Sequence, residues 1–236
     1  MIPQDMRSRL RAGKIKRRSP VARREPKINI RRQRSLATRK KIIDAAVTLI
    51  ATKGLSGATF DAIAKAAKLS PTLPVFHYKS KKALFTELLR VLSGLYTESW
   101  NAFVDAPGIG AKERLERFIA HDVGFAGKHP KAVAVWFAFW GDRSGRELYR
   151  LVSRRVDDFY FAAMRDAVEK LKAEGGYALV DAEAVASSIY LQTFGFWLFH
   201  SLGGGAAALA QVERSMAFLL ATAFPRHFGD HRSKAR

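Results

Sequence analysis

The stretch Thr59–Tyr78, TFDAIAKAAKLSPTLPVFHY, decides the fold of this chain. It holds two short segments whose apolar residues recur at helical spacing, about four residues apart, with Leu69 in the turn between them. This spacing is typical of a helix-turn-helix, in which one helix braces a second that enters the DNA major groove. An ordinary helix corner is the competing interpretation of this window taken alone.

Start and stop signals extend this pattern in both directions. A first helix is expected from Ser35 or Thr38 as the cap, and Gly54 should end it in a left-handed conformation. Its apolar stripe consists of Ile42, Ile43, Ala46, Leu49 and Ile50. The caps expected for the next three helices are Thr59, Ser70, with Pro71 at the first helical position, and Ser80.

The flanking motifs make the interpretation specific. The run TRKKIIDAAVTLIATKGLSGATFDAIAKAAKLS and the later HYKSKKALFTELL resemble the TetR family of bacterial transcriptional regulators over residues 38–89. The matching pieces are T-R-x-x-I-I-x-A-A, K-G, A-T-x-x-x-I-A-x-A-A, the L-S turn and H-Y-x-S-K-x-A-L-F. The resemblance implies an N-terminal DNA-binding domain, a C-terminal domain for ligand binding and dimerisation, and usually repression.

The same resemblance supplies the expected DNA-binding residues. They are Arg39, Thr59, Ser70, Pro71, Thr72, Leu73, Val75, Phe76, His77, Tyr78 and Lys81. Lys81 is the best phosphate candidate by its chemistry, and a solvated surface position is its alternative. Three residues depart from the family pattern: Lys68 replaces a turn glycine, Pro74 an aliphatic residue, and Val75 a frequent tyrosine.

The segment Val133–Trp140, VAVWFAFW, with the following RELYRLVSRRVDDFY, is similar to the C-terminal domain of BetI-type, choline-responsive regulators over roughly 111–200. This resemblance implies choline or a relative as effector, because aromatic side chains bind quaternary ammonium ions. The candidate ligand-binding residues are Trp100, Phe125, Trp136, Phe139, Trp140, Phe194 and Trp197. Plain core packing is the alternative for each. Asp122 or Asp142 could balance the cation, although a capping role suits Asp142 better.

Net charge is concentrated at the N-terminus. The chain has 236 residues with 41 Lys+Arg and 21 Asp+Glu, a formal charge of +20. Residues 1–41 carry 16 of the basic residues but only Asp5 and Glu25 as acids. We expect 1–34 to be a disordered basic arm. Three interpretations of this arm are open. It adds nonspecific contacts to DNA phosphates, it has no dedicated role, or it is an organelle transit peptide.

Helical periodicity continues to the end of the chain, which predicts an all-α protein of about nine helices. The expected divisions are the arm 1–34, a helix-turn-helix domain 35–82, a ligand-binding and dimerisation domain 83–226 and a polar tail 227–236. The uncharged run 184–212 fits a buried helix, a glycine turn and another helix better than a membrane span. By the resemblance, the last two long helices would form a homodimer.

Catalytic and metal motifs are missing from the sequence, which has no Cys, no H-E-x-x-H, no phosphate loop and no G-x-S-x-G. The adjacent His121 and Asp122 are expected to point apart on a helix. We therefore expect no enzyme, no cofactor and no metal site. The expected protein is a dimeric repressor in the cytoplasm, associated with the nucleoid, that binds a palindromic operator and is released by a small molecule. Alternatives are a TetR-type activator, an architectural protein driven by the basic arm and a membrane-surface protein.

Overall fold

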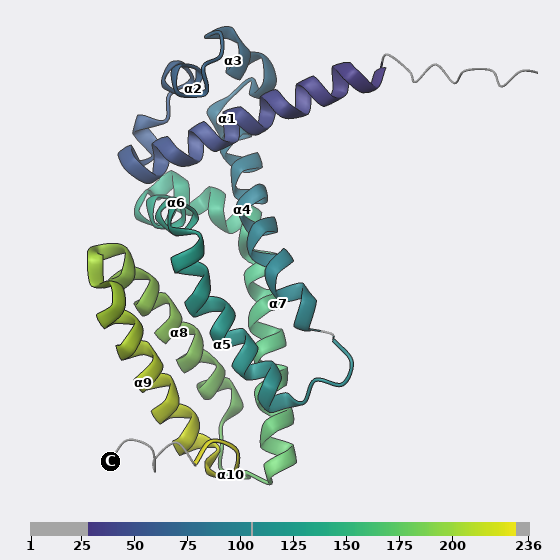
Figure 1. The fold of residues 1–236 in the computed structure, drawn as a ribbon, viewed down its shortest axis with the longest axis vertical. Coiled ribbons are helices and arrows are strands. Elements are labelled where there is room, and N and C mark those ends of the chain that lie inside the picture. Colours follow the sequence, from purple (N-terminus) through teal and green to yellow (C-terminus); the bar gives the residue numbers. More distant parts are fainter. Residues whose placement is uncertain (1–27, 105, 230–236) are drawn as a thin grey trace, which may run out of the picture. The chain divides into compact units, whose positions relative to one another are not determined.

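The computed structural model describes residues 28–104 and 106–229, and every regular element in these ranges is helical (Figure 1). This confirms the all-α expectation. The helices are α1 (Ile28–Gly57), α2 (Phe60–Ala67), α3 (Thr72–Tyr78), α4 (Lys81–Val104), α5 (Ala111–Lys128), α6 (Pro130–Gly141), α7 (Arg143–Gly175), α8 (Ala182–Phe199), α9 (Gly205–Ala223) and α10 (Pro225–Phe228). Residues up to Thr38 form one unit and those from Arg39 onward form another, so each is described by itself.

Helix α1 starts earlier than the sequence suggests. It begins at Ile28, so the expected starts at Ser35 and Thr38 are wrong. The Thr38 hydroxyl donates to the Arg34 carbonyl at 2.9 Å, which is the bond of a threonine inside a helix rather than of a cap. Residues 28–34 are therefore helical, contrary to the expected disorder, whereas residues 1–27 of the expected arm lie outside the described residues.

The helix-turn-helix forms where the sequence predicts it. Gly54 interrupts α1 with a positive φ of 70°, but its ψ of −178° is not that of the expected left-handed cap, and one more helical turn follows to Gly57. The Thr59 side chain accepts a hydrogen bond from the Ala62 N–H at 3.1 Å and so caps α2. Lys68 ends α2 in the left-handed conformation, with φ 54° and ψ 45°. A lysine there costs about 1 kcal/mol relative to glycine, so this turn is strained.

Pro74 lies inside α3 without breaking it. A residue with an N–H at this position would bond the Ser70 carbonyl, but that carbonyl instead accepts from the Leu73 N–H at 3.1 Å. Pro74 is itself buried and lies in the first turn, where loss of one donor is tolerated. The expected cap through the Ser70 side chain is wrong, because its hydroxyl lies 3.3 Å from that of Thr72 and α3 has no side-chain cap.

The remaining helices pack around one apolar core. Figure 1 shows α4, α5 and α7 side by side, with α8 and α9 running as a pair along them. The largest fully buried side chains include Trp100, Phe118, Phe125, Phe139 and Tyr160. Asp142 caps α7 by accepting from the Gly145 N–H at 2.7 Å, which confirms its expected capping role. Gly145 is required there, because a Cβ would lie 2.7 Å from the Phe139 carbonyl oxygen.

The uncharged run divides as expected into α8, a glycine-rich connection His200–Gly204, and α9. No described helix is long and apolar enough to cross a bilayer. The start of the expected polar tail is folded. Phe228 in α10 is buried, and the Arg226 guanidinium donates to the Gly175 carbonyl at 2.7 Å, so 225–228 dock onto the end of α7. Residues 230–236 of the expected tail lie outside the described residues.

Candidate effector cavity and DNA-binding surface

A small cavity lies within the core, among α4, α6, α7 and α8. It is lined by Ser93, Tyr96, Trp136, Trp140, Tyr149, Val156, Asp157, Tyr160, Tyr190, Phe194 and Trp197. Its volume is about 20 Å³, which holds one water molecule. The cavity is therefore too small for a larger ligand, which must displace some of its side chains.

Aromatic rings form most of the cavity wall. Trp136 and Trp197 stack with ring centroids 5.6 Å apart and planes 14° apart. Trp140 meets Tyr149 edge-on at 5.5 Å and packs against Phe194 at 5.3 Å. Rings in these orientations offer π faces to a cation that enters between them.

Asp157 supplies the single carboxylate among the cavity-lining residues. The Tyr149 hydroxyl donates to its Oδ2 at 2.9 Å. Burial raises the pKa of Asp157 to about 6, Asp158 nearby also raises it, and the bond from Tyr149 opposes that rise. Since no Lys or Arg lines the cavity, the anionic carboxylate lacks a positive partner there. A bound cation would supply that missing charge.

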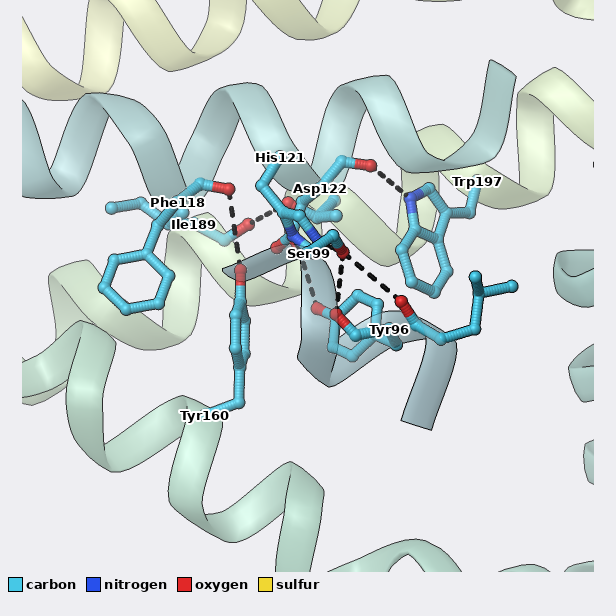
Figure 2. A network of polar contacts seen from close by, with 10 residues as sticks. Tyr96, Ser99, Phe118, His121, Asp122, Tyr160, Ile189 and Trp197 are labelled. Carbon is cyan, nitrogen blue, oxygen red and sulfur yellow. Dashed lines mark hydrogen bonds and ion pairs between the residues drawn. The ribbon is translucent and has the colours of Figure 1, made fainter. Parts of the chain in front are cut away.

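The carboxylate of Asp122, which is fully buried, already has hydrogen-bond partners. Tyr96 donates to its Oδ1 at 2.7 Å, and His121 Nδ1 lies 3.1 Å from the same oxygen. His121 Nε2 lies 2.6 Å from the Ser99 hydroxyl, and the Trp197 indole N–H donates to the Asp122 backbone carbonyl at 2.8 Å. Figure 2 shows this network joining α4, α5 and α8. The expectation that His121 and Asp122 point apart is therefore wrong.

The structure places the seven candidate ligand-binding residues in two groups. Trp136, Trp140, Phe194 and Trp197 line the cavity. The other three lie outside its wall. Trp100 stacks on Phe159 at 5.6 Å, Phe125 stacks behind Trp136 at 5.5 Å, and Phe139 meets Phe85 edge-on at 5.5 Å.

The DNA-binding surface expected on α3 is exposed and partly apolar. Thr72, Val75 and Phe76 are exposed, with Phe76 at 64%. His77 is half-buried, and desolvation with the nearby Arg39 and Lys79 charges lowers its pKa. Pro74 and Tyr78 face the interior. The exposed positions are the side chains that α3 can present to a partner.

Two expected contact residues are used within the fold instead. The Arg39 guanidinium lies 4.9 Å above the Tyr78 ring and 3.4 Å from a Glu87 carboxylate oxygen. The Lys81 ammonium approaches the Leu55 carbonyl at 3.4 Å. In this conformation both side chains hold the helix-turn-helix together rather than extend towards a phosphate.

Two family models match the chain. Residues 42–88 match the model described as bacterial regulatory proteins, tetR family, and residues 111–225 match the one described as BetI-type transcriptional repressor, C-terminal. The chain belongs to the TetR family. TetR proteins are transcriptional regulators, so the expectation that the chain is not an enzyme is confirmed.

Individual TetR relatives agree with this assignment. HTH-type transcriptional regulator BetI of Rhizobium meliloti (strain 1021) is 28% identical over 160 residues, which cover 64% of this chain and 78% of that protein. BetI of Brucella anthropi is 26% identical over 194 residues, covering 77% and 93%. Sequence similarity thus extends from the DNA-binding region into the C-terminal domain.

Solved structures show the same fold. A putative transcriptional regulator from Pseudomonas aeruginosa PAO1 has a TM-score of 0.65 at 26% identity, covering 84% of this chain and 95% of that one. A putative regulator from Saccharomonospora viridis, solved in complex with choline, has a TM-score of 0.67 at 20% identity, covering 78% and 96%.

Sequence reasoning about this TetR protein missed the polar members of the cavity. Asp157, Tyr149 and Tyr160 share one face of α7, at spacings of eight and three residues, and Tyr190 comes from α8. The available signal was an acidic residue on the apolar face of an amphipathic helix. This signal is weak in the sequence, because two adjacent aspartates at 157–158 are typical of a solvent-exposed position. Only the packing of α7 shows that Asp157 faces the cavity. Among the described residues, no group of His, Asp and Glu could hold a metal.

Proposed function

We propose that this protein is a homodimeric repressor that binds a palindromic operator and is released by a small cation, a quaternary ammonium compound. The observation that carries the proposal is the carboxylate of Asp157, which is half-buried and lines an aromatic cavity. A quaternary ammonium cannot donate hydrogen bonds, so cation–π contacts and a counter-charge are its means of recognition.

The free energy available from cation–π contacts is large enough for a specific effector. Each good cation–π contact contributes about 0.5–2 kcal/mol, and four Trp and Phe rings line the cavity. The name BetI of the relatives and the choline bound in the Saccharomonospora viridis structure support the same chemical class. Because the cavity holds only about 20 Å³, effector binding requires the rings to separate, which links occupancy to a conformational change.

Helix α4 is the element that would transmit this change. Ser93 and Tyr96 on α4 line the cavity, whereas Lys81 at its start contacts the Leu55 carbonyl in the helix-turn-helix. A buried bond of 3.1 Å between the Ser93 and Ser153 hydroxyls ties α4 to α7. Shifting a 1:99 conformational equilibrium to 99:1 requires the effector to favour one state by about 5.5 kcal/mol.

Exposed apolar side chains on α8, α9 and their connection support dimerisation there. The large ones are Leu191, Leu198, Phe199, Leu202, Leu209 and Phe218. Leu202 is 74% exposed and Phe218 is 67% exposed, which is unfavourable in a monomer. Two subunits packing these helices into a four-helix bundle would cover them, and the resulting twofold axis suits a palindromic operator.

The decisive experiment selects bound sequences from random double-stranded DNA, with and without choline. The proposal expects one palindrome to be enriched and choline to weaken its binding. Retained or tightened binding with choline, together with activated transcription, would favour the activator alternative. Enrichment of no sequence would favour the architectural protein driven by the arm. We place the proposed repressor in the cytoplasm, at the nucleoid where its operator lies.

A further inference from the structure

A second hollow lies on the outer side of α4 and α5, away from the aromatic cavity. It is lined by Ser99, Phe103, Arg117, Ala120, His121, Phe125, Lys128 and His129, and its volume is about 420 Å³. That volume lies within the 300–1,000 Å³ common for small-molecule sites. We call it the α4–α5 cleft.

The ionisable side chains that line the cleft are all basic. They are Arg117, His121, Lys128 and His129, and no carboxylate lines it. Arg117 is partly neutralised by Glu113, whose Oε1 lies 2.6 Å from the guanidinium. Burial, followed by the charges of Lys128 and His121, lowers the pKa of His129, which is the effect expected of positive surroundings.

Aromatic rings form the apolar side of the cleft. Phe103 and Phe125 are buried core residues that reach its surface. The His129 ring lies 4.7 Å from the Phe125 ring, and the His121 ring lies 6.2 Å from that of Phe103. Basic groups and flat apolar surface therefore meet in one hollow.

We propose that the α4–α5 cleft is a second ligand site, which binds an organic anion: a carboxylate or phosphate monoester carried on a small aromatic or aliphatic group. The anionic end interacts with Arg117, Lys128 and His129, and the apolar part lies on Phe103 and Phe125. Charge-assisted hydrogen bonds from guanidinium and ammonium groups are the usual means of holding such an anion, and the His129 imidazole adds a polar contact.

The cleft also has a direct connection to the core. His121 lies between the Ser99 hydroxyl at 2.6 Å and the Asp122 carboxylate at 3.1 Å, and Tyr96 donates to that carboxylate at 2.7 Å (Figure 2). Tyr96 in turn lines the aromatic cavity. An anion bound beside His121 perturbs the hydrogen bonds through which this imidazole joins Ser99 to Asp122, so its presence is communicated to the cavity wall.

Calorimetry with phenyl phosphate, benzoate, inorganic phosphate and phenol tests the proposal on the full chain. We expect saturable binding of phenyl phosphate or benzoate that is at least fivefold tighter than that of inorganic phosphate or phenol. Preference between the first two shows whether phosphate or carboxylate is the natural group. No saturable binding of either would overturn the proposal.

The variants Arg117→Gln and Lys128→Gln locate the site, because both side chains are exposed and both variants should fold. Each should weaken binding of the tighter probe at least threefold, whereas Lys170→Gln, on the exposed side of α7, should not. Equal affinities in all three would show that the probe responds to overall charge alone. Imidazole NMR signals should move on binding, with the pKa of His129 rising.

This inference does not depend on the cationic effector. Asp157→Asn, which alters the aromatic cavity, should leave anion binding in the cleft intact. Loss of choline binding with retained phenyl phosphate binding in this variant would support both sites. Loss of phenyl phosphate binding would contradict the cleft, and unchanged choline affinity would contradict the role of Asp157 in the aromatic cavity.

Discussion

The Tyr149 hydroxyl donates a hydrogen bond of 2.9 Å to the Asp157 carboxylate, two turns further along α7. Both side chains line the small aromatic cavity. This bond keeps a half-buried carboxylate in an apolar surrounding that raises its pKa to about 6. The protein retains a partly desolvated, costly charge where a cation would compensate it.

Asp157→Asn should separate stability from effector binding. The amide keeps an acceptor for Tyr149 but removes the charge, so choline affinity should fall about tenfold or more, ~1.4 kcal/mol. Stability at pH 7 should rise by about 1–3 kcal/mol, because a shift from 3.8 to about 6 reflects unfavourable burial of the charged form. Calorimetry and thermal unfolding measure the two effects. Asp158→Asn, at an exposed neighbouring position, is the control. Unchanged choline affinity in Asp157→Asn would refute its role as counter-charge.

Choline affinity should depend on pH through the same residue. The Asp157 carboxylate is ionised above its pKa of about 6, so affinity should be constant above pH 7 and fall as the pH drops through 6. Stability of the free protein should change in the opposite sense. Because the folded-state pKa of Asp157 is raised above 3.8, the protonated carboxyl is favoured in the folded protein. The free energy of unfolding is therefore highest below pH 3.8 and decreases as the pH rises through about 6. A titration of affinity from pH 5.5 to 8 tests this, and Asp157→Asn should remove the dependence.

Lys68→Gly should stabilise the helix-turn-helix. Lys68 has a φ of 54°, which glycine adopts without steric cost, so we expect a gain of about 1 kcal/mol. Lys65→Gly, inside α2, is the matched control and should lose up to about 1 kcal/mol. Denaturant unfolding measures both, and effects of the same sign in the two variants would contradict the strained turn.

Operator recognition should depend on α3 rather than on net charge. Thr72→Ala and Phe76→Ala should each weaken binding to the selected palindrome by about 1–3 kcal/mol, with little change in the salt dependence. Deletion of residues 2–27 should instead flatten the salt dependence and keep the sequence preference, because it removes basic charge but leaves the exposed residues of α3 unchanged. Fluorescence anisotropy at several salt concentrations distinguishes the two, and loss of preference on deletion would contradict this division.

Dimerisation should depend on the exposed apolar residues of α8 and α9. A charge introduced by Phe218→Glu would lie within the proposed bundle, so this variant should sediment as a monomer at micromolar concentration, while the parent sediments as a dimer. Leu179→Glu changes a fully exposed residue between α7 and α8 and should leave the dimer intact. A monomeric parent protein would refute the proposed assembly.

Local signals in the sequence were sufficient for most of the helices. The cap at Thr59, the interruption at Gly54 and the glycine connection after α8 were readable because each depends on the backbone preference of a few local residues. The start of α1 was not readable in this way. Like-charged residues there suggested disorder, but residues 28–34 are helical.

The sequence by itself determined the helix-turn-helix, the TetR resemblance and the aromatic character of the C-terminal domain. Only the tertiary structure decided which aromatic rings surround a cavity, that Asp157 rather than Asp122 is left without a positive partner there, and that four basic residues share the α4–α5 cleft. The physical reason is the distance along the sequence over which each effect acts. Capping and periodicity act within a few residues, whereas burial and charge balance at a site depend on helices that meet only after folding.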